Sequence, residues 1–204
     1  NYIAILAFLK DFKSLDKRIV LQGQRDPLSK PKFEIVDERS AYNGWRTITH
    51  RDIRMPSGHI ATFDIMKQND PTVLVFSWCT KSLSTTLIHE LSPGKMSLNC
   101  GVVAGICEQS KHDSPLEAAK FELEEEAHLN GGEWISLITD SEGNIGTLPT
   151  EKYSTSSSYA FLVLDPVPAI EPRTLDMEEY IEIERNVTAS EVTRRIQCGE
   201  MNIA

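Results

Sequence analysis

The chain has 204 residues, of which 40% are hydrophobic and 25% charged, and its net charge is −9. These values are typical of a folded globular protein with one main domain. An acidic chain lacks the clustered Lys and Arg that phosphate backbones require, so we expect no nucleic-acid partner. No apolar run reaches membrane-spanning length, so we expect no membrane partner either.

The four cysteines (Cys79, Cys100, Cys107 and Cys198) contain no CxxC pair. Scattered thiols indicate a reducing compartment and disfavour a zinc site. We therefore expect an intracellular, cytoplasmic protein, or an organellar one if a leader has been removed ahead of Asn1. We expect Cys100 and Cys107 to lie in or beside the core.

We expect residues 1–70 to form an N-terminal extension and a β unit, and residues 71–204 to form the main domain. Residues 1–30 form the extension. Alternating side chains then indicate strands, and Pro56-Ser57-Gly58 is a turn signal before the last of them. The predicted strands of this unit are 33–36, 45–54 and 59–65.

We expect the main domain to contain strands and two helices, which makes it a mixed α/β domain. Residues 72–78 read as a buried central strand, and residues 85–91 are predicted to be its partner. A closing helix is expected over 187–199, with Ser190 as its candidate N-cap. The later predicted strands are 133–138, 159–164 and 178–183.

A helix beginning at Pro115 is the most informative element of the chain. Pro suits the first helical turn, and Ser114 precedes it as a natural N-cap. The apolar residues of this helix have the spacing of a buried face. The residues expected to be buried are Ala118, Ala119, Leu123 and Leu129.

Glu122, Glu125 and Glu126 lie at i, i+3 and i+4 and therefore share one helical face. Carboxylates gathered in this way repel one another unless a cation neutralises them, and Mg²⁺ prefers oxygen ligands of this kind. The alternative is a solvated acidic face near the helix N-terminus, where negative charge is favoured.

The stretch from Gly101 to Leu129 resembles the Nudix box, whose pattern is Gly-x5-Glu-x7-Arg-Glu-U-x-Glu-Glu-x-Gly-U. The run Glu122-Leu123-Glu124-Glu125-Glu126 matches its central Glu-U-x-Glu-Glu, and Leu129 matches its last apolar position. The chain departs from the pattern at other positions: Phe121 replaces the Arg that braces the glutamates, His128 the late Gly and Asp113 the upstream Glu, and the interval from Gly105 to Asp113 is about two residues longer.

The resemblance implies an α/β/α sandwich with a mixed sheet and a small N-terminal β extension. It also implies a Mg²⁺-dependent hydrolase, with Mn²⁺ as the alternative ion, that cleaves the pyrophosphate of a nucleoside diphosphate sugar such as ADP-ribose. By the same resemblance, the metal ligands are the backbone carbonyl of Ala104 and the side chains of Glu122, Glu125 and Glu126. Glu125 and Glu126 are then also catalytic residues, and the base that activates water is one of Asp176, Glu178 and Glu179.

In the resembled branch an Arg before Pro-Gly contacts phosphate, and Ser92 stands at that place here. His89 or Lys95 would then have to supply the substrate-binding cation. Trp45 is a candidate to stack on the nucleobase, and its alternative role is simple packing. The resemblance further implies a homodimer held by the N-terminal region.

The rival hypothesis is a binding or scaffold protein that keeps this fold with weak or no turnover. Phe121, His128 and Ser92 favour it, because glutamates without a bracing cation position a metal loosely. Since Phe cannot donate a hydrogen bond, we expect the ring of Phe121 to pack on apolar neighbours.

Overall fold

The computed structural model describes residues 31–44, 46–140 and 142–201. The extension predicted for residues 1–30 and the predicted stacking residue Trp45 lie outside the described residues. Among the described helices, none is long and apolar enough to cross a membrane.

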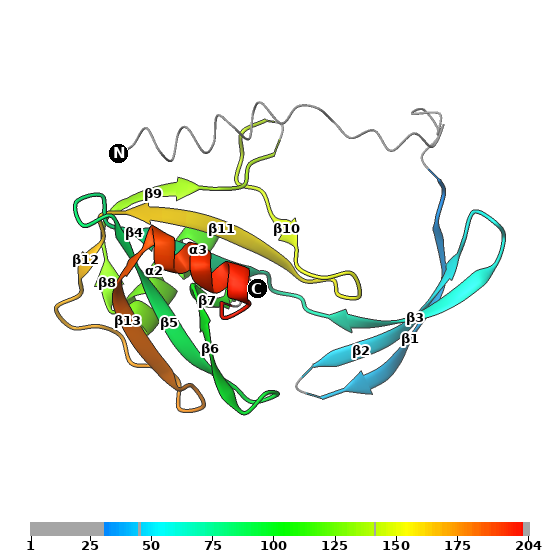
Figure 1. The fold of residues 1–204 in the computed structure, drawn as a ribbon. Helices are drawn as coiled ribbons and strands as arrows, with labels where there is room; N and C mark the ends of the chain where they lie inside the picture. Colours follow the sequence, from blue (N-terminus) through cyan, green and yellow to red (C-terminus); the bar gives the residue numbers. More distant parts are fainter. Residues whose placement is uncertain (1–30, 45, 141, 202–204) are drawn as a thin grey trace.

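Three antiparallel strands form an N-terminal sheet that extends away from the rest of the protein (Figure 1). Gly58, at φ +86°, makes the turn between the second and third strands, and its N–H donates to the carbonyl of Met55. A residue without a Cβ enters this backbone region without strain. The strands confirm the predicted β unit. They are β1 (Glu34–Asn43), β2 (Thr47–Arg54) and β3 (Ile60–Lys67).

The end of β3 is fastened to the polar loop at 150–156. The N–H of Met66 donates to the carbonyl of Tyr153 over 2.8 Å, and the N–H of Thr155 donates back to Met66 over 3.0 Å. The rings of Phe63 and Tyr153 are stacked with centroids 6.2 Å apart. The sheet is therefore held to the main body at β3, whereas every residue of β1 is exposed.

Strand β4 lies inside a mixed sheet, as predicted for residues 72–78. It pairs in parallel with β11 on one side and antiparallel with β7 on the other. Val73 and Val75 are buried, which is expected for a strand with neighbours on both edges. The strands of this sheet are β4 (Thr72–Trp78), β7 (Val103–Ile106), β9 (Glu133–Ser136), β10 (Leu148–Pro149) and β11 (Ser157–Leu164).

The strand that follows β4 belongs to a different sheet, so the predicted pairing of residues 72–78 with 85–91 is wrong. β5 lies between β13 and β6, and both pairings are antiparallel. The edges of β4 are already taken by β7 and β11, and hydropathy alone carries no information on which strands pair. The strands of this second sheet are β5 (Ser84–Ser92), β6 (Ser97–Gly101) and β13 (Ile181–Thr188). A short pair, β8 (Leu129–Asn130) with β12 (Val167–Pro168), completes the body.

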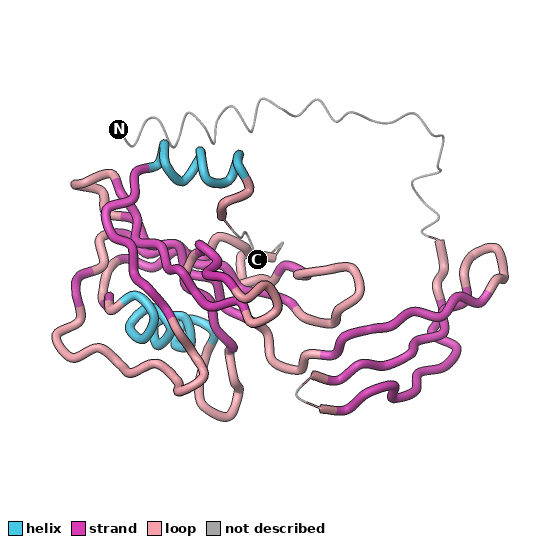
Figure 2. Tube along the Cα trace, turned by 60° about the horizontal axis from the view of Figure 1, so that its bottom comes forward, coloured by secondary structure: helices cyan, strands magenta, loops and turns pink. Residues whose placement is uncertain are grey.

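The two described helices lie on opposite faces of the β5 sheet (Figures 1 and 2). Ile88 of β5 packs with Leu123 of α2 (Pro115–Ala127), in a core that also contains β4, β7 and β11. Its neighbour Leu87 faces the other way and packs with Val192 of α3 (Ala189–Cys198). Successive residues of a strand point to opposite faces, so one strand serves both helices. The predicted mixed α/β fold is confirmed.

The last helix lies within the predicted range of 187–199 but has a different N-cap. β13 continues to Thr188, and the side chain of Thr188 accepts a hydrogen bond from the N–H of Glu191. Thr188 is therefore the N-cap, and the assignment of this role to Ser190 is wrong. The preceding strand likewise starts at Ile181, not at residue 178. Boundaries shift easily because a β-branched residue such as Thr suits both a strand end and an N-cap.

The ends of α2 follow the predicted signals closely. Ser114 accepts from the N–H of Glu117, and Pro115 occupies the first turn. At the other end, His128 is the C-cap in the left-handed conformation, at φ 51° and ψ 41°. The Nudix pattern places Gly at this position, and the backbone geometry supplies the reason: a Cβ is strained there.

We expect His128→Gly to stabilise the protein by about 1 kcal/mol, because it relieves the left-handed strain of a non-glycine residue. Urea unfolding of both proteins measures the difference. Asn186, at φ 60°, is the matched control, since Asn tolerates this conformation better than His. A gain from Asn186→Gly equal to that from His128→Gly would contradict the explanation.

Candidate functional site

The glutamate face of α2 lies against β7. Glu126 is only 3% exposed, and its Oε2 accepts a hydrogen bond from the N–H of Ala104 over 3.0 Å. The N–H and C=O of one strand residue point to the same side, so the carbonyl of Ala104 also faces the helix. The structure thus brings Ala104 and Glu126, which are 22 residues apart, to one place.

Glu122 lies directly over Gly105, the next residue of β7. A Cβ added to Gly105 would lie 2.0 Å from both the carboxyl carbon and Oε1 of Glu122. Real atoms do not approach so closely, so any side chain at this position would displace the carboxylate. Because residue 105 has no side chain, the carboxylate of Glu122 can occupy the space above it.

Burial and mutual repulsion make these carboxylates reluctant to ionise. Burial is the main cause that raises the pKa of Glu126 to about 9. Burial, followed by the charge of Glu125, raises the pKa of Glu122 to about 7. The pKa of Glu125 is also raised, first by burial and then by the charges of Glu179 and Asp176. A nearby cation would reverse these shifts, because it favours the charged form.

The segment between β12 and β13 brings further acids to the same face. Asp176 and Glu179 act on the glutamates through their charges, as the raised pKa values of Glu122 and Glu125 indicate. The N–H of Glu179 donates to the carbonyl of Asp176 over 3.1 Å, so the two residues form one local turn. Glu178, the third candidate from the sequence, lies between them and is exposed.

Sequence reasoning missed three residues around this face. Glu90 of β5 points to the α2 side, and burial followed by the charge of Glu179 raises its pKa. Lys111 pairs with Glu108 over 2.6 Å, and Arg173 has its guanidinium carbon 3.7 Å from the ring centre of Phe121. Alternation along β5 puts Ile88 and Glu90 on one face, but it does not say which helix covers that face.

The environment of Phe121 differs from the expected one. Its ring meets His112 edge-on, with centroids 5.2 Å apart, and lies beneath Arg173. The ring is half-buried, so it is not a core residue. Besides the apolar neighbours expected from the sequence, the ring therefore has an imidazole and a guanidinium as partners.

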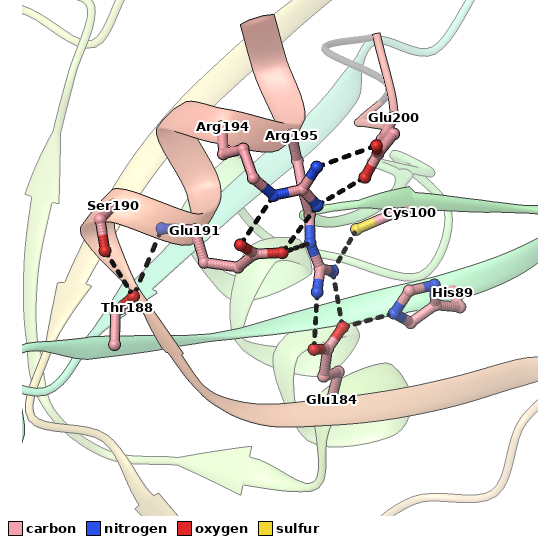
Figure 3. Close-up of polar contacts among 9 residues, drawn as sticks. All are labelled: His89, Cys100, Glu184, Thr188, Ser190, Glu191, Arg194, Arg195 and Glu200. Atoms are coloured by element: carbon pink, nitrogen blue, oxygen red, sulfur yellow. Dashed lines mark hydrogen bonds and ion pairs between the residues drawn. The ribbon is translucent and has the colours of Figure 1, made fainter. Parts of the chain in front are cut away.

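His89, predicted to bind substrate, lies on the other face of β5, in a network beside α3 (Figure 3). Its Nε2 is 2.7 Å from Oε2 of Glu184. Arg195 donates one hydrogen bond to each carboxylate oxygen of Glu184. Hydrogen bonds from Arg195 and then His89 lower the pKa of Glu184 to about 2. The structure thus separates His89 from the glutamate face by the thickness of a sheet.

Lys95, the other described residue predicted to bind substrate, forms no hydrogen bond or ion pair with the glutamates either. Lys95 is exposed in the turn between β5 and β6, where its N–H donates to Ser92 over 3.1 Å. Among the described residues, no hydrogen bond or ion pair joins its side chain to α2. Within the described ranges, the charges of Arg173 and Lys111 act on Glu125 and partly offset the rise of its pKa that burial and Glu179 cause.

The oxygen atoms on this face are ligands of the kind that a hard divalent cation binds. Carboxylate and carbonyl oxygens are the ligands that Mg²⁺ prefers, and Gly105 leaves room for the carboxylate of Glu122. As they stand, no three His, Cys, Asp or Glu side chains within the described ranges converge on one point. Like charges spread apart in this way, so a cation would have to draw the carboxylates together.

The fold is similar to that of a solved protein described as "Crystal structure of ADP compounds hydrolase". The match has a TM-score of 0.66 and 19% sequence identity, and it covers 85% of this chain and 86% of the other. At this identity the similarity establishes the fold. No family model matches the chain, and no curated protein sequence matches it.

Proposed function

We propose that the protein is a Nudix-type hydrolase that depends on a divalent cation and cleaves the diphosphate of a nucleoside diphosphate-linked compound. The observation that carries the proposal is the seating of Glu122 over Gly105, with Glu126 bonded to Ala104 alongside. A fold shared with an ADP compounds hydrolase supports the same class of substrate. ADP-ribose is the first compound to test.

The proposed metal ligands are the carbonyl of Ala104 and the carboxylates of Glu122, Glu125 and Glu126. Mg²⁺ or Mn²⁺ bound there would polarise the phosphate and lower the pKa of bound water. The buried carboxylate of Glu126 accepts a hydrogen bond from the N–H of Ala104, so one of the proposed metal ligands is held against the strand. Asp176 or Glu179 would take the proton from the attacking water, because both lie beside the glutamates.

The test is a panel of nucleoside diphosphate sugars, with ADP-ribose first, incubated with Mg²⁺ and then with Mn²⁺. The proposal expects release of a nucleoside monophosphate that stops when the ion is chelated. The compound with the highest kcat/KM then identifies the sugar and the base.

The second candidate is a binding or scaffold protein with this fold. It is favoured by the separation of the carboxylates, since no three of the described acids converge on one point. A protein of this kind would bind a nucleotide sugar without releasing nucleoside monophosphate. Calorimetric titration with ADP-ribose, run beside the turnover assay, separates the two functions.

We further propose that two copies associate through the N-terminal sheet. Among the described strands β1 is at an edge; Ile35 and Tyr42 on it are 58% and 57% exposed, and Phe33 just before it is 58% exposed. Exposed apolar side chains on an unpaired edge favour pairing with another chain.

We also retain the proposal of an intracellular location, which the four free thiols support.

We expect sedimentation to give about twice the monomer mass of 22.9 kDa. Ile35→Lys should shift the population to monomer, because a charge would then be buried between copies. Leu137, which is 55% exposed and far from β1 in sequence, supplies the control Leu137→Lys. A monomeric parent protein, or a dimer unaffected by Ile35→Lys, would contradict the interface.

A further inference from the structure

The segment of residues 169–180, which carries Asp176 and Glu179, is fixed at its two ends. The N–H of Ala169 donates to the carbonyl of His128 over 3.1 Å, and the N–H of Leu91 donates to the carbonyl of Tyr180 over 3.0 Å. Between these anchors, the hydrogen bonds found in the described chain are local and join Asp176 to Glu179. The backbone of the segment is therefore weakly tied to α2.

Electrostatic repulsion acts to move this segment away from the helix. The negative charges of Asp176 and Glu179 disfavour ionisation of Glu122 and Glu125. Like charges at this range separate unless another contact holds them. A contact in the middle of the segment would offset this repulsion.

Arg173 makes such a contact. Its guanidinium carbon lies 3.7 Å from the ring centre of Phe121, which is within the range of a cation–π interaction. The edge-on contact with His112 fixes the ring from another side. The positive charge of Arg173 also lies near Glu125 and offsets the repulsion between the segment and α2.

We propose that Arg173 is a positioning residue: by stacking on Phe121 it holds the segment 169–180 against α2, so that Asp176 and Glu179 lie beside the metal-binding glutamates. The role of those acids rests on the proposed function. The stacking itself does not, because it is a property of the protein without substrate or metal.

Limited cleavage by chymotrypsin, with the cut sites identified by mass spectrometry, tests the contact directly. Leu175 is half-buried, so the rate of cleavage after Leu175 reports how often the segment opens. We expect Arg173→Ala to accelerate this cut about two- to fivefold, as the strength of exposed cation–π contacts implies. Phe121→Leu, which keeps an apolar side chain without an aromatic face, should have the same effect.

Three comparisons make the cleavage result specific. The double variant should be cut no faster than either single variant, because both remove one contact. Arg173→Lys should restore much of the protection, since Lys also carries a charge. The matched control is Lys152→Ala, which removes the cation over Tyr153 at 4.9 Å in a different loop. Unchanged cleavage in Arg173→Ala, or full additivity in the double variant, would overturn the proposal.

Kinetics supply the second readout. On whichever nucleotide sugar is turned over, Arg173→Ala should lower kcat by up to about fivefold with KM unchanged, because the proton-accepting acid is in place for a smaller share of the time. A raised KM with unchanged kcat would assign Arg173 to substrate contact and overturn its positioning role. If no compound is turned over, the proposed function fails, while the cleavage assay still decides whether Arg173 holds the segment.

Discussion

Glu126→Gln is expected to make the metal-free protein more stable at pH 8, and the gain should shrink to less than about 1 kcal/mol at pH 5. The reason is the burial of Glu126, which raises its pKa from 4.5 to about 9. The unfolded chain loses this proton near pH 4.5, whereas the folded protein keeps it until about pH 9. Between those values the folded state binds more protons, so the stability that Glu126 contributes falls as the pH rises.

The slope of this loss is at most about 1.4 kcal/mol per pH unit. Gln mimics the protonated acid and can still accept the hydrogen bond from Ala104, so the variant escapes the loss. The pKa of Glu184, lowered to about 2, adds no slope in this window, because Glu184 is ionised in both states above about pH 5. The difference between parent and variant therefore reports Glu126 together with its electrostatic coupling to Glu122.

Urea unfolding at pH 5, 6.5 and 8 in the presence of a chelator measures the effect. Glu124→Gln is the control, because Glu124 lies on the same helix but off the glutamate face. We expect it to change stability by less than about 0.5 kcal/mol at every pH, as surface substitutions usually do. A pH-independent effect of Glu126→Gln would contradict the burial of this carboxyl as the cause.

Gly105→Ala should reduce turnover of a nucleotide sugar by a factor of order 10² while changing the free energy of unfolding by less than about 1 kcal/mol. The added methyl would lie 2.0 Å from the carboxylate of Glu122. That carboxylate is the end of a flexible side chain, so it can swing aside at little cost to the fold. Its displacement removes a metal ligand, and a metal contributes several kcal/mol to transition-state stabilisation.

Gly94→Ala is the matched control for this substitution. Gly94 has open space around its Cβ position, so the same chemical change there meets no carboxylate. Mn²⁺ affinity, measured from the free ion by electron paramagnetic resonance, should fall in Gly105→Ala and stay at the parent value in Gly94→Ala. Retention of both Mn²⁺ affinity and turnover rate in Gly105→Ala would show that Glu122 does not act from its position over Gly105.

The helix and its buried face were predictable from sequence because their signals are local. Ser114 and Pro115 mark the start, and the spacing of Leu123 and its neighbours marks the buried side. The gathering of Glu122, Glu125 and Glu126 follows from helical periodicity alone. Nothing further along the chain was needed to predict this element.

The surroundings of the helix were not predictable in the same way. β5 is covered on one face by α2 and on the other by α3, so its sequence does not distinguish the side of Glu90 from the side of His89. Arg173 lies in a segment without regular structure, where no periodicity fixes the direction of a side chain. These residues were placed by tertiary packing, which spacing in one sequence does not encode.

Release of AMP from ADP-ribose by the parent protein, Glu126→Gln and Glu124→Gln tests the central claim most directly. With Mg²⁺ present, the parent and Glu124→Gln should release AMP at similar rates, and a chelator should stop both. Glu126→Gln should be slower by a factor of order 10², because it removes the charge that holds the cation on the diphosphate. Equal rates in all three proteins, or AMP release that persists after chelation, would contradict hydrolysis at the glutamate face.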